Sequence, residues 1–230
     1  IIRPRLTSGL NVFNLKNETK KNLVDLEKDV LRTMLGLRDK APMNAIYKLT
    51  GQLPIKAHLD KGILSIIYNI WSNETNPVNT LMKLCSGDPH NKGTWLEEAE
   101  RVLKHYSLPD IKSLLALKCP EKLSWKNFCH KEVQEKWQCI IECEIQDLKY
   151  PELLGPEPTA LNNKITESLR DANTWTDLQA IKCMIQIMGD SFSNNDKSKK
   201  CGKRISDLCT NCGEKETLLH AIYCKNYKDD

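Results

Sequence analysis

The most strongly helical part of the chain is residues 54–71, PIKAHLDKGILSIIYNIW. Its aliphatic residues recur at steps of four, four, three and four, at Ile55, Leu59, Ile63, Ile66 and Ile70. This spacing places their side chains on one face of a helix. Pro54 stands where the helix would begin, because a proline in the first turn loses no helical hydrogen bond. We therefore predict a helix that starts after Pro54 and has one apolar face.

Similar signals on both sides of this stretch predict a mainly α fold, a multi-helix body with a small zinc knuckle at the C-terminal end. Periodicity and stop signals predict further helices over residues 19–36, 42–49, 77–85, 94–106, 109–119, 124–150, 160–171 and 176–188. Ser124 is the expected cap of the longest of these. Residues 1–16 are expected to be irregular or to form a short strand, because apolar and polar residues alternate at 10–15, and a hairpin is expected near 205–215.

The composition excludes two classes of protein. Of 230 residues, 40% are hydrophobic and patterned, which is enough to form a core and argues against disorder throughout. The densest apolar run, residues 63–71, is far shorter than the roughly 20 residues of a membrane helix, so no membrane is expected as a partner.

The first residues lack the pattern of a secretion signal, and the chain does not begin with Met. We therefore expect an intracellular location, nucleus or cytoplasm, and interpret the chain as part of a longer protein.

Ten cysteines are many for this length and allow two interpretations. In a secreted protein they would form disulfides, whereas in an intracellular protein they stay reduced and a subset can bind metal. The end of the chain favours metal, because Cys209 and Cys212 are followed by His220 and Cys224. The pattern is C-x2-C-x7-H-x3-C.

These four residues have the spacing of a zinc site. Two cysteines separated by two residues can direct both sulfurs at one ion, and Gly213 tolerates the tight turn that this needs. A helical turn would place His220 and Cys224 on one face. Four sulfur and nitrogen ligands suit tetrahedral Zn²⁺ with no open position, so the predicted cofactor is structural zinc. The alternative is a set of unrelated thiols in a cysteine-rich chain.

A basic segment comes directly before this motif. The formal charge of +4 is too small to indicate a partner by itself. Within eight positions, however, the chain carries five cations and no acidic residue: Lys197, Lys199, Lys200, Lys203 and Arg204. Lysines beside a compact metal knuckle suit a phosphate backbone, which predicts RNA or DNA as the partner. The alternative is a solvated linker that is basic by chance.

Three segments of the chain resemble a known family. LRTMLGLRDKAPMNAIY (31–47) and LTGQLPIKAHL (49–59) resemble the region that follows the reverse transcriptase domain of non-LTR (LINE-type) retrotransposon polyproteins. The part from Trp175 through Cys224 resembles the tail of those polyproteins, which carries a CCHC knuckle. One spacing departs from the family: three residues separate His220 from Cys224, where the family more often has four. The likeness is weak over residues 75–170.

The resemblance implies a role in target-primed reverse transcription, in which the polymerase copies element RNA from a nicked chromosomal end. It implies thumb-like helices in residues 1–90, a helical linker region in 91–190, and a basic linker with the CCHC zinc knuckle in 191–230. These parts would hold template RNA and target DNA. An upstream reverse transcriptase domain would be the partner in the parent chain, and no small-molecule substrate is implied.

By itself the chain is not expected to be an enzyme. A polymerase needs carboxylates that hold two metal ions. The final Tyr227-Lys228-Asp229-Asp230 matches a short string of reverse transcriptases, but it follows the knuckle and no palm domain precedes it. We interpret Asp110 as a residue at the start of a helix rather than part of a nuclease site.

Two other functions stay open. The chain could be a zinc-stabilised helical module that binds protein, with the basic segment incidental, or a decayed element copy without a function.

Several other residues are expected to be ordinary surface or core residues rather than ligands: His58, His90, His105, His130, Cys139, Cys143, Trp125 and Trp137.

Overall fold

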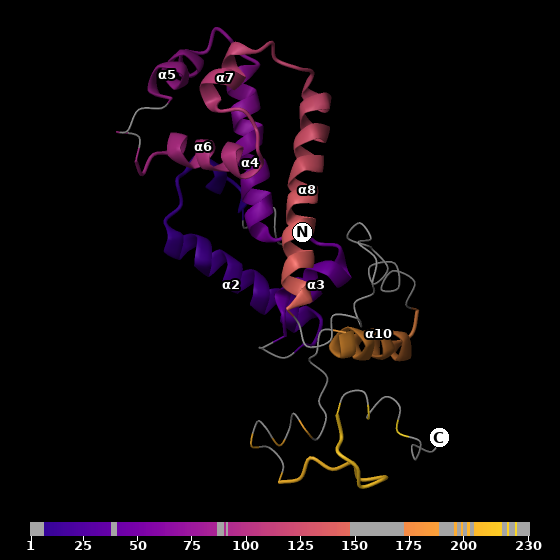
Figure 1. The fold of residues 1–230 in the computed structure, drawn as a ribbon. Coiled ribbons are helices and arrows are strands. Elements are labelled where there is room, and N and C mark those ends of the chain that lie inside the picture. Colours follow the sequence, from indigo (N-terminus) through magenta and orange to yellow (C-terminus); the bar gives the residue numbers. More distant parts are fainter. Residues whose placement is uncertain are drawn as a thin grey trace.

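The computed structural model shows a body of helices followed by a shorter cysteine-containing segment (Figure 1). It describes residues 7–37, 41–86, 90, 92–147, 173–188, 196, 199, 202, 205–217, 220 and 224, so the helix expected over 160–171 lies outside the described residues. The elements in chain order are η1 (Leu10–Val12, a 3-10 turn), α2 (Asn17–Met34), α3 (Met43–Thr50), α4 (Ile55–Trp71), α5 (Pro77–Cys85), α6 (Trp95–His105), α7 (Ile111–Ala116), α8 (Lys122–Gln146) and α10 (Trp175–Met188). The described β-structure is one antiparallel bridge, Leu208 with Lys215, so the mainly α prediction is confirmed.

Helix α4 lies at the centre of the body. Figure 1 shows α8 running alongside it, and α4 also packs against η1, α2, α5 and α6. The predicted apolar face is buried at Ile55 and Ile63, and Leu64, Ile67 and Trp71 are buried as well. A helix that is apolar on most sides belongs in the middle of a core. In the described part of the chain, no helix combines the length and hydropathy needed to cross a membrane.

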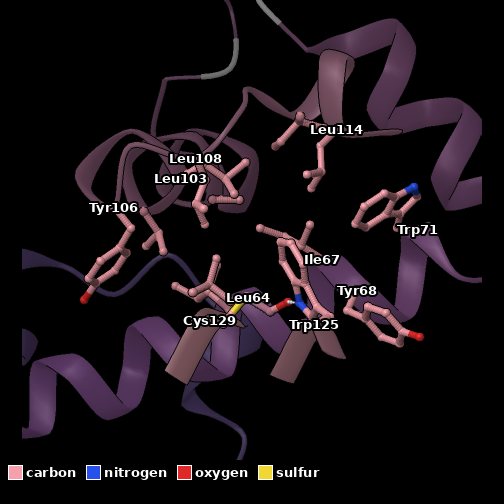
Figure 2. Packing of buried hydrophobic residues seen from close by; sticks show 14 of the residues in the cluster. Leu64, Ile67, Tyr68, Trp71, Leu103, Tyr106, Leu108, Leu114, Trp125 and Cys129 are labelled. Carbon is pink, nitrogen blue, oxygen red and sulfur yellow. Dashed lines mark hydrogen bonds between the residues drawn. The ribbon is translucent and has the colours of Figure 1, made fainter. Parts of the chain in front are cut away.

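Helix α8 packs over α4 in the core through Trp125 (Figure 2). The ring of Trp125 packs edge-on against Trp71, with 5.5 Å between ring centroids, and its indole N–H donates to the carbonyl of Leu64 (3.3 Å). The indole N–H of Trp137 donates to the hydroxyl of Tyr106 (3.0 Å). Trp125 is therefore a core residue, as predicted, and Trp137 is half-buried against the core. The core contains side chains from both sides of residue 90.

The carboxylate of Asp60 joins α4 to α6. It accepts hydrogen bonds from Arg101 Nη2 (3.1 Å) and from the hydroxyl of Tyr106 (2.8 Å). Arg101 also donates twice to Glu98 (2.9 and 2.8 Å), and Glu98 accepts from Lys20 on α2 (2.8 Å). Burial alone would raise the pKa of Glu98, but the hydrogen bonds from Arg101 and Lys20 hold it below its usual value. The charges of this network compensate one another inside the body.

A second buried carboxylate, that of Glu27 on α2, caps the start of α4. It accepts from the hydroxyl of Tyr47 on α3 (2.7 Å) and from the backbone N–H of Ile55, the first residue of α4 (2.9 Å). That N–H has no partner within its own helix, and a negative charge is favourable beside the helix N-terminus. Glu27 thus holds three helices together.

Local caps mark three of the predicted helix ends. The hydroxyl of Thr94 accepts from the N–H of Glu97 (3.4 Å) at the start of α6. The carboxylate of Asp110 accepts from the N–H of Ser113 (2.8 Å) at the start of α7. Gly51 ends α3 with φ at 64°, a conformation that side chains disfavour.

Of the two conformations expected for residues 1–16, irregular or short strand, the strand at 10–15 is wrong, because residues 10–12 form the 3-10 turn η1 instead. The indole N–H of Trp95 donates to the carbonyl of Asn11 (2.7 Å), and η1 packs against α4. The fit is close: a Cβ on Gly62 would lie 2.6 Å from Asn11 Nδ2. An extended segment at residues 10–12 would lose these contacts with Trp95 and α4.

Two details of the long helices also differ from prediction. Helix α8 begins at Lys122 with Glu121 as its N-cap, so Ser124 lies inside the first turn and does not cap it. The helix over 19–36 is predicted from the spacing of Leu23, Leu26, Val30 and Met34. Met34 is nevertheless 71% exposed, whereas the charged Glu27 is buried. The capping contact described above places Glu27 inward.

We expect Glu27→Ala to lower the free energy of unfolding by about 3 kcal/mol, because two buried donors lose this acceptor. Urea unfolding followed by circular dichroism measures the change. Asp29→Asn, on the exposed side of α2, is the control and should change stability by less than about 0.5 kcal/mol. A Glu27→Ala protein as stable as the wild type would show that this carboxylate does not hold α4.

Candidate metal centre

Cys209 and Cys212 lie on a tight turn that connects the two residues of the β-bridge, Leu208 and Lys215. The N–H of Cys209 donates to the carbonyl of Glu214 (2.7 Å), and the N–H of Gly213 donates back to the carbonyl of Cys209 (2.9 Å). Gly213 has φ at 77°, where glycine is favoured. The hairpin expected near residues 205–215 is present as this short bridge and turn.

The side chains of the four predicted ligands converge, and we call them the Cys/His cluster: Cys209, Cys212, His220 and Cys224. Their ligand atoms all lie within 4.8 Å of one another. Cys209 Sγ is 3.9 Å from Cys224 Sγ, and Cys212 Sγ is 3.1 Å from His220 Nε2. Cys209 and Cys224 are buried, and the other two are half-buried. The cluster could bind a metal ion.

The distances fit a tetrahedral metal site rather than a disulfide. A Zn–S bond of about 2.3 Å places two sulfurs of a tetrahedral site about 3.8 Å apart, close to the 3.9 Å between Cys209 and Cys224. A disulfide would bring them to about 2.05 Å, and the described cysteines are free thiols. Three sulfurs and one nitrogen fill a tetrahedron, which suits a structural ion.

Glu214 and Thr217 orient the histidine of the cluster. Nε2 of His220 faces Cys212, whereas Nδ1 lies 3.5 Å from Glu214 Oε2. A carboxylate on the second ring nitrogen is typical around metal-binding histidines and fixes the tautomer. The backbone N–H of His220 donates to Thr217 Oγ1 (3.1 Å). Sequence reasoning missed both residues; an acidic residue directly after the Cys-x2-Cys-Gly turn is the signal that points to Glu214.

The thiols of the turn differ in acidity. The backbone N–H of Asn211 points at Cys209 Sγ (3.5 Å) and lowers the pKa of that thiol to about 7. The backbone N–H of Glu214 acts in the same direction on Cys212, but burial and the neighbouring thiols Cys224 and Cys209 outweigh it and raise the pKa of Cys212 to about 11. One thiolate therefore forms readily, and a cation is needed before a second forms beside it.

The basic segment is attached to the cluster region by ion pairs. Lys199 Nζ lies 2.9 Å from Asp207 Oδ1 and holds the pKa of that carboxyl below its usual value. Asp196 is buried, and its carboxylate lies 3.3 Å from Lys215 Nζ. Of the five residues predicted to contact nucleic acid, the structure describes Lys199 alone. The others lie outside the described residues: Lys197, Lys200, Lys203 and Arg204.

Within the described residues, the Cys/His cluster is the one place where three or more such ligands meet. Cys139 and Cys143 are exposed on α8. His105 packs against the rings of Tyr106 and Trp137, and burial lowers its pKa.

Comparisons of the chain with protein families, with curated proteins and with solved structures found no match. The function is therefore inferred from the cluster, the charges beside it and the resemblance of the sequence.

We expect Cys209→Ser to abolish stoichiometric metal binding by the full chain, because a closed four-ligand site loses one of its buried sulfurs. Elemental analysis of zinc after dialysis measures the metal content per chain. Cys139→Ser removes an exposed thiol on α8 and should leave it unchanged. Undiminished zinc in Cys209→Ser would refute the assignment of the ligands.

Metal affinity should fall as the pH is lowered from 8 to 6. The ligands bind as thiolates and neutral imidazole, so protons compete with the metal, and the pKa values of about 7 and about 11 place this competition in the accessible range. Cobalt titrations at several pH values measure the apparent affinity, and weakly buffered samples should acidify when zinc is added. A pH-independent affinity would contradict ligation by thiolates.

Proposed function

We propose that the chain is a non-catalytic, nucleic-acid-binding part of a non-LTR retrotransposon reverse transcriptase, with structural zinc in its C-terminal knuckle. The observation that carries this proposal is the convergence of the Cys/His cluster, at knuckle spacing, beside the basic segment. Within this proposal, polymerase chemistry belongs to the parent chain. The helices and the knuckle hold template RNA or target DNA.

Zinc would be held by the three sulfurs of the cluster and by Nε2 of His220. A segment this small has little apolar core, so its folding would be coupled to metal binding. The ion pairs of Lys199 and Lys215 bind the preceding segment to the same unit. Metal binding would thereby fix where the cations of the basic segment are presented.

The basic segment would contact phosphates. Lys199 is exposed and its partner is a partly exposed carboxylate, so this ion pair is weak and a phosphate can replace the carboxylate. Each phosphate that is neutralised releases condensed counterions, which favours binding at low salt. Such contacts do not read sequence, in keeping with a role in holding RNA or DNA rather than selecting a site.

The helical body supports the same proposal through the resembling segments. Residues 31–47 and 49–59 cover the end of α2, all of α3 except Lys48, and the start of α4. Glu27 links these three elements through Tyr47 and Ile55. The resembling part is thus one packed unit of helices, which is what a thumb-like region needs.

A second function, protein binding, is favoured by one specific observation. Helix α5 exposes three apolar side chains, Val78 (43%), Leu81 (59%) and Leu84 (76%), and Val12 of η1 is 53% exposed. Neighbouring exposed apolar residues are typical of interaction surfaces. In this case the basic segment would be incidental.

The salt dependence of RNA binding distinguishes the two functions. We expect the affinity for a single-stranded RNA to fall steeply as the salt concentration rises. The slope of log affinity against log salt concentration should become shallower by about 0.7 for each phosphate contact removed. The variant K197Q/K200Q/K203Q/R204Q should therefore reduce the slope by up to about 3. Fluorescence anisotropy at several salt concentrations gives both slopes.

The matched control, K83Q/K104Q/K112Q/K118Q, removes four exposed lysines of the helical body. The control protein therefore has the same net charge as the K197Q/K200Q/K203Q/R204Q variant. It should retain most of the wild-type slope. An equal loss in both proteins would assign the binding to net charge alone. Absence of RNA binding at low salt would refute the nucleic-acid function and leave protein binding.

A further inference from the structure

A pocket of about 380 Å³ lies between α4 and α8, on the helical body. This volume is in the range of small-molecule sites. Its apolar lining consists of buried side chains: Leu64, Tyr68, Trp125 and Cys129. Figure 2 shows these four residues together.

The polar atoms of this apolar lining are already used. The hydroxyl of Tyr68 donates to the carbonyl of Pro120 (3.1 Å), and the indole N–H of Trp125 donates to Leu64 (3.3 Å). The two rings lie nearly parallel, at 22° with 6.4 Å between centroids. Burial raises the pKa of the Cys129 thiol to about 12, so it stays neutral. A ligand therefore meets carbon, sulfur and ring surface here.

The rest of the lining is polar, with Ser65, Asn127 and four basic residues. The basic residues are Lys61, Lys122, Lys126 and His130, and no acidic residue lines the pocket. In the described part of the chain, no carboxylate oxygen lies within 4.0 Å of any of these three ammonium groups. Nζ of Lys61 is 2.7 Å from Nδ1 of His130, a contact that requires a neutral imidazole as acceptor.

The contact between Lys61 and His130 disfavours the charged form of both side chains. Burial lowers the pKa of Lys61, and burial together with the charges of Lys61 and Lys126 lowers the pKa of His130. Lys61 is half-buried and His130 is exposed, and within the described residues no carboxylate joins these two basic groups. An anion placed between them would favour the charged form of both.

We propose that this pocket binds a small organic anion with a flat aromatic ring, of the chemistry and size of a nucleoside monophosphate. The ring lies against Tyr68 and Trp125, where stacking and burial of apolar surface favour it. The phosphate lies at the cationic rim, where Lys61 and Lys126 donate to it. The pocket is built from α4 and α8 alone, so this inference does not depend on the Cys/His cluster.

Isothermal titration calorimetry of the full chain with adenosine 5′-monophosphate tests the proposal, with adenosine and inorganic phosphate as partial ligands. The monophosphate should bind more tightly than either partial ligand by about tenfold or more, because only it uses both the lining and the rim. The Cys209→Ser protein should bind the monophosphate as tightly as the wild type does, because the pocket does not include the Cys/His cluster. Loss of the proposed zinc site would therefore leave this binding unchanged, so the two proposals can fail independently.

Two variants locate the binding. K122Q/K126Q removes two exposed rim charges and should weaken binding by about tenfold or more, whereas K83Q/K112Q removes two exposed charges elsewhere and should not. Ser65→Trp, at an exposed lining position of α4, should block the pocket. No binding of the monophosphate at millimolar concentration, binding no tighter than that of adenosine, or equal losses in both lysine pairs would overturn the proposal.

Discussion

The carboxylate of Asp60 lies in the middle of α4, the helix that the others surround, and it is 1% exposed. A buried carboxylate is tolerated only where charged and hydrogen-bonding partners replace water. Arg101 and Tyr106 supply those partners, and Arg101 is in turn held by Glu98, which Lys20 also contacts. The network therefore makes the packing of α2, α4 and α6 mutually dependent, because removing one partner leaves another charge uncompensated.

Most helices could be predicted because their signals are local. Aliphatic spacing marked α4, and Thr94, Asp110 and Gly51 marked helix ends with side chains or backbone geometry that act within a few residues. The inward carboxylate of Glu27 could not be predicted in this way, since periodicity assigns charged residues to solvent and its partners lie 20 and 28 positions along the chain. The alternation at residues 10–15 misled for a related reason: contacts with Trp95 and Gly62, far along the chain, decide its conformation.

The candidate metal centre was predictable to the extent that it is local. Its four ligands form two short sequence pairs, and the turn between Cys209 and Gly213 brings the first pair together. The role of Lys199 was not visible, because a lysine in a basic run has the same sequence signature whether it is solvated or paired with Asp207. The pocket was also not visible, since Lys61 and Lys126 approach each other only when α4 packs against α8.

The packing of α8 over α4 also has a consequence for biosynthesis. Trp125 follows its partner Leu64 by 61 residues. At about 5–20 residues per second, a ribosome needs about 3 to 12 s to add that interval. During this time α4 has left the ribosome without the helix that covers one of its apolar sides, and such a segment is prone to aggregate or to be bound by chaperones. The yield of folded protein is thus tied to the pace of translation between these two helices.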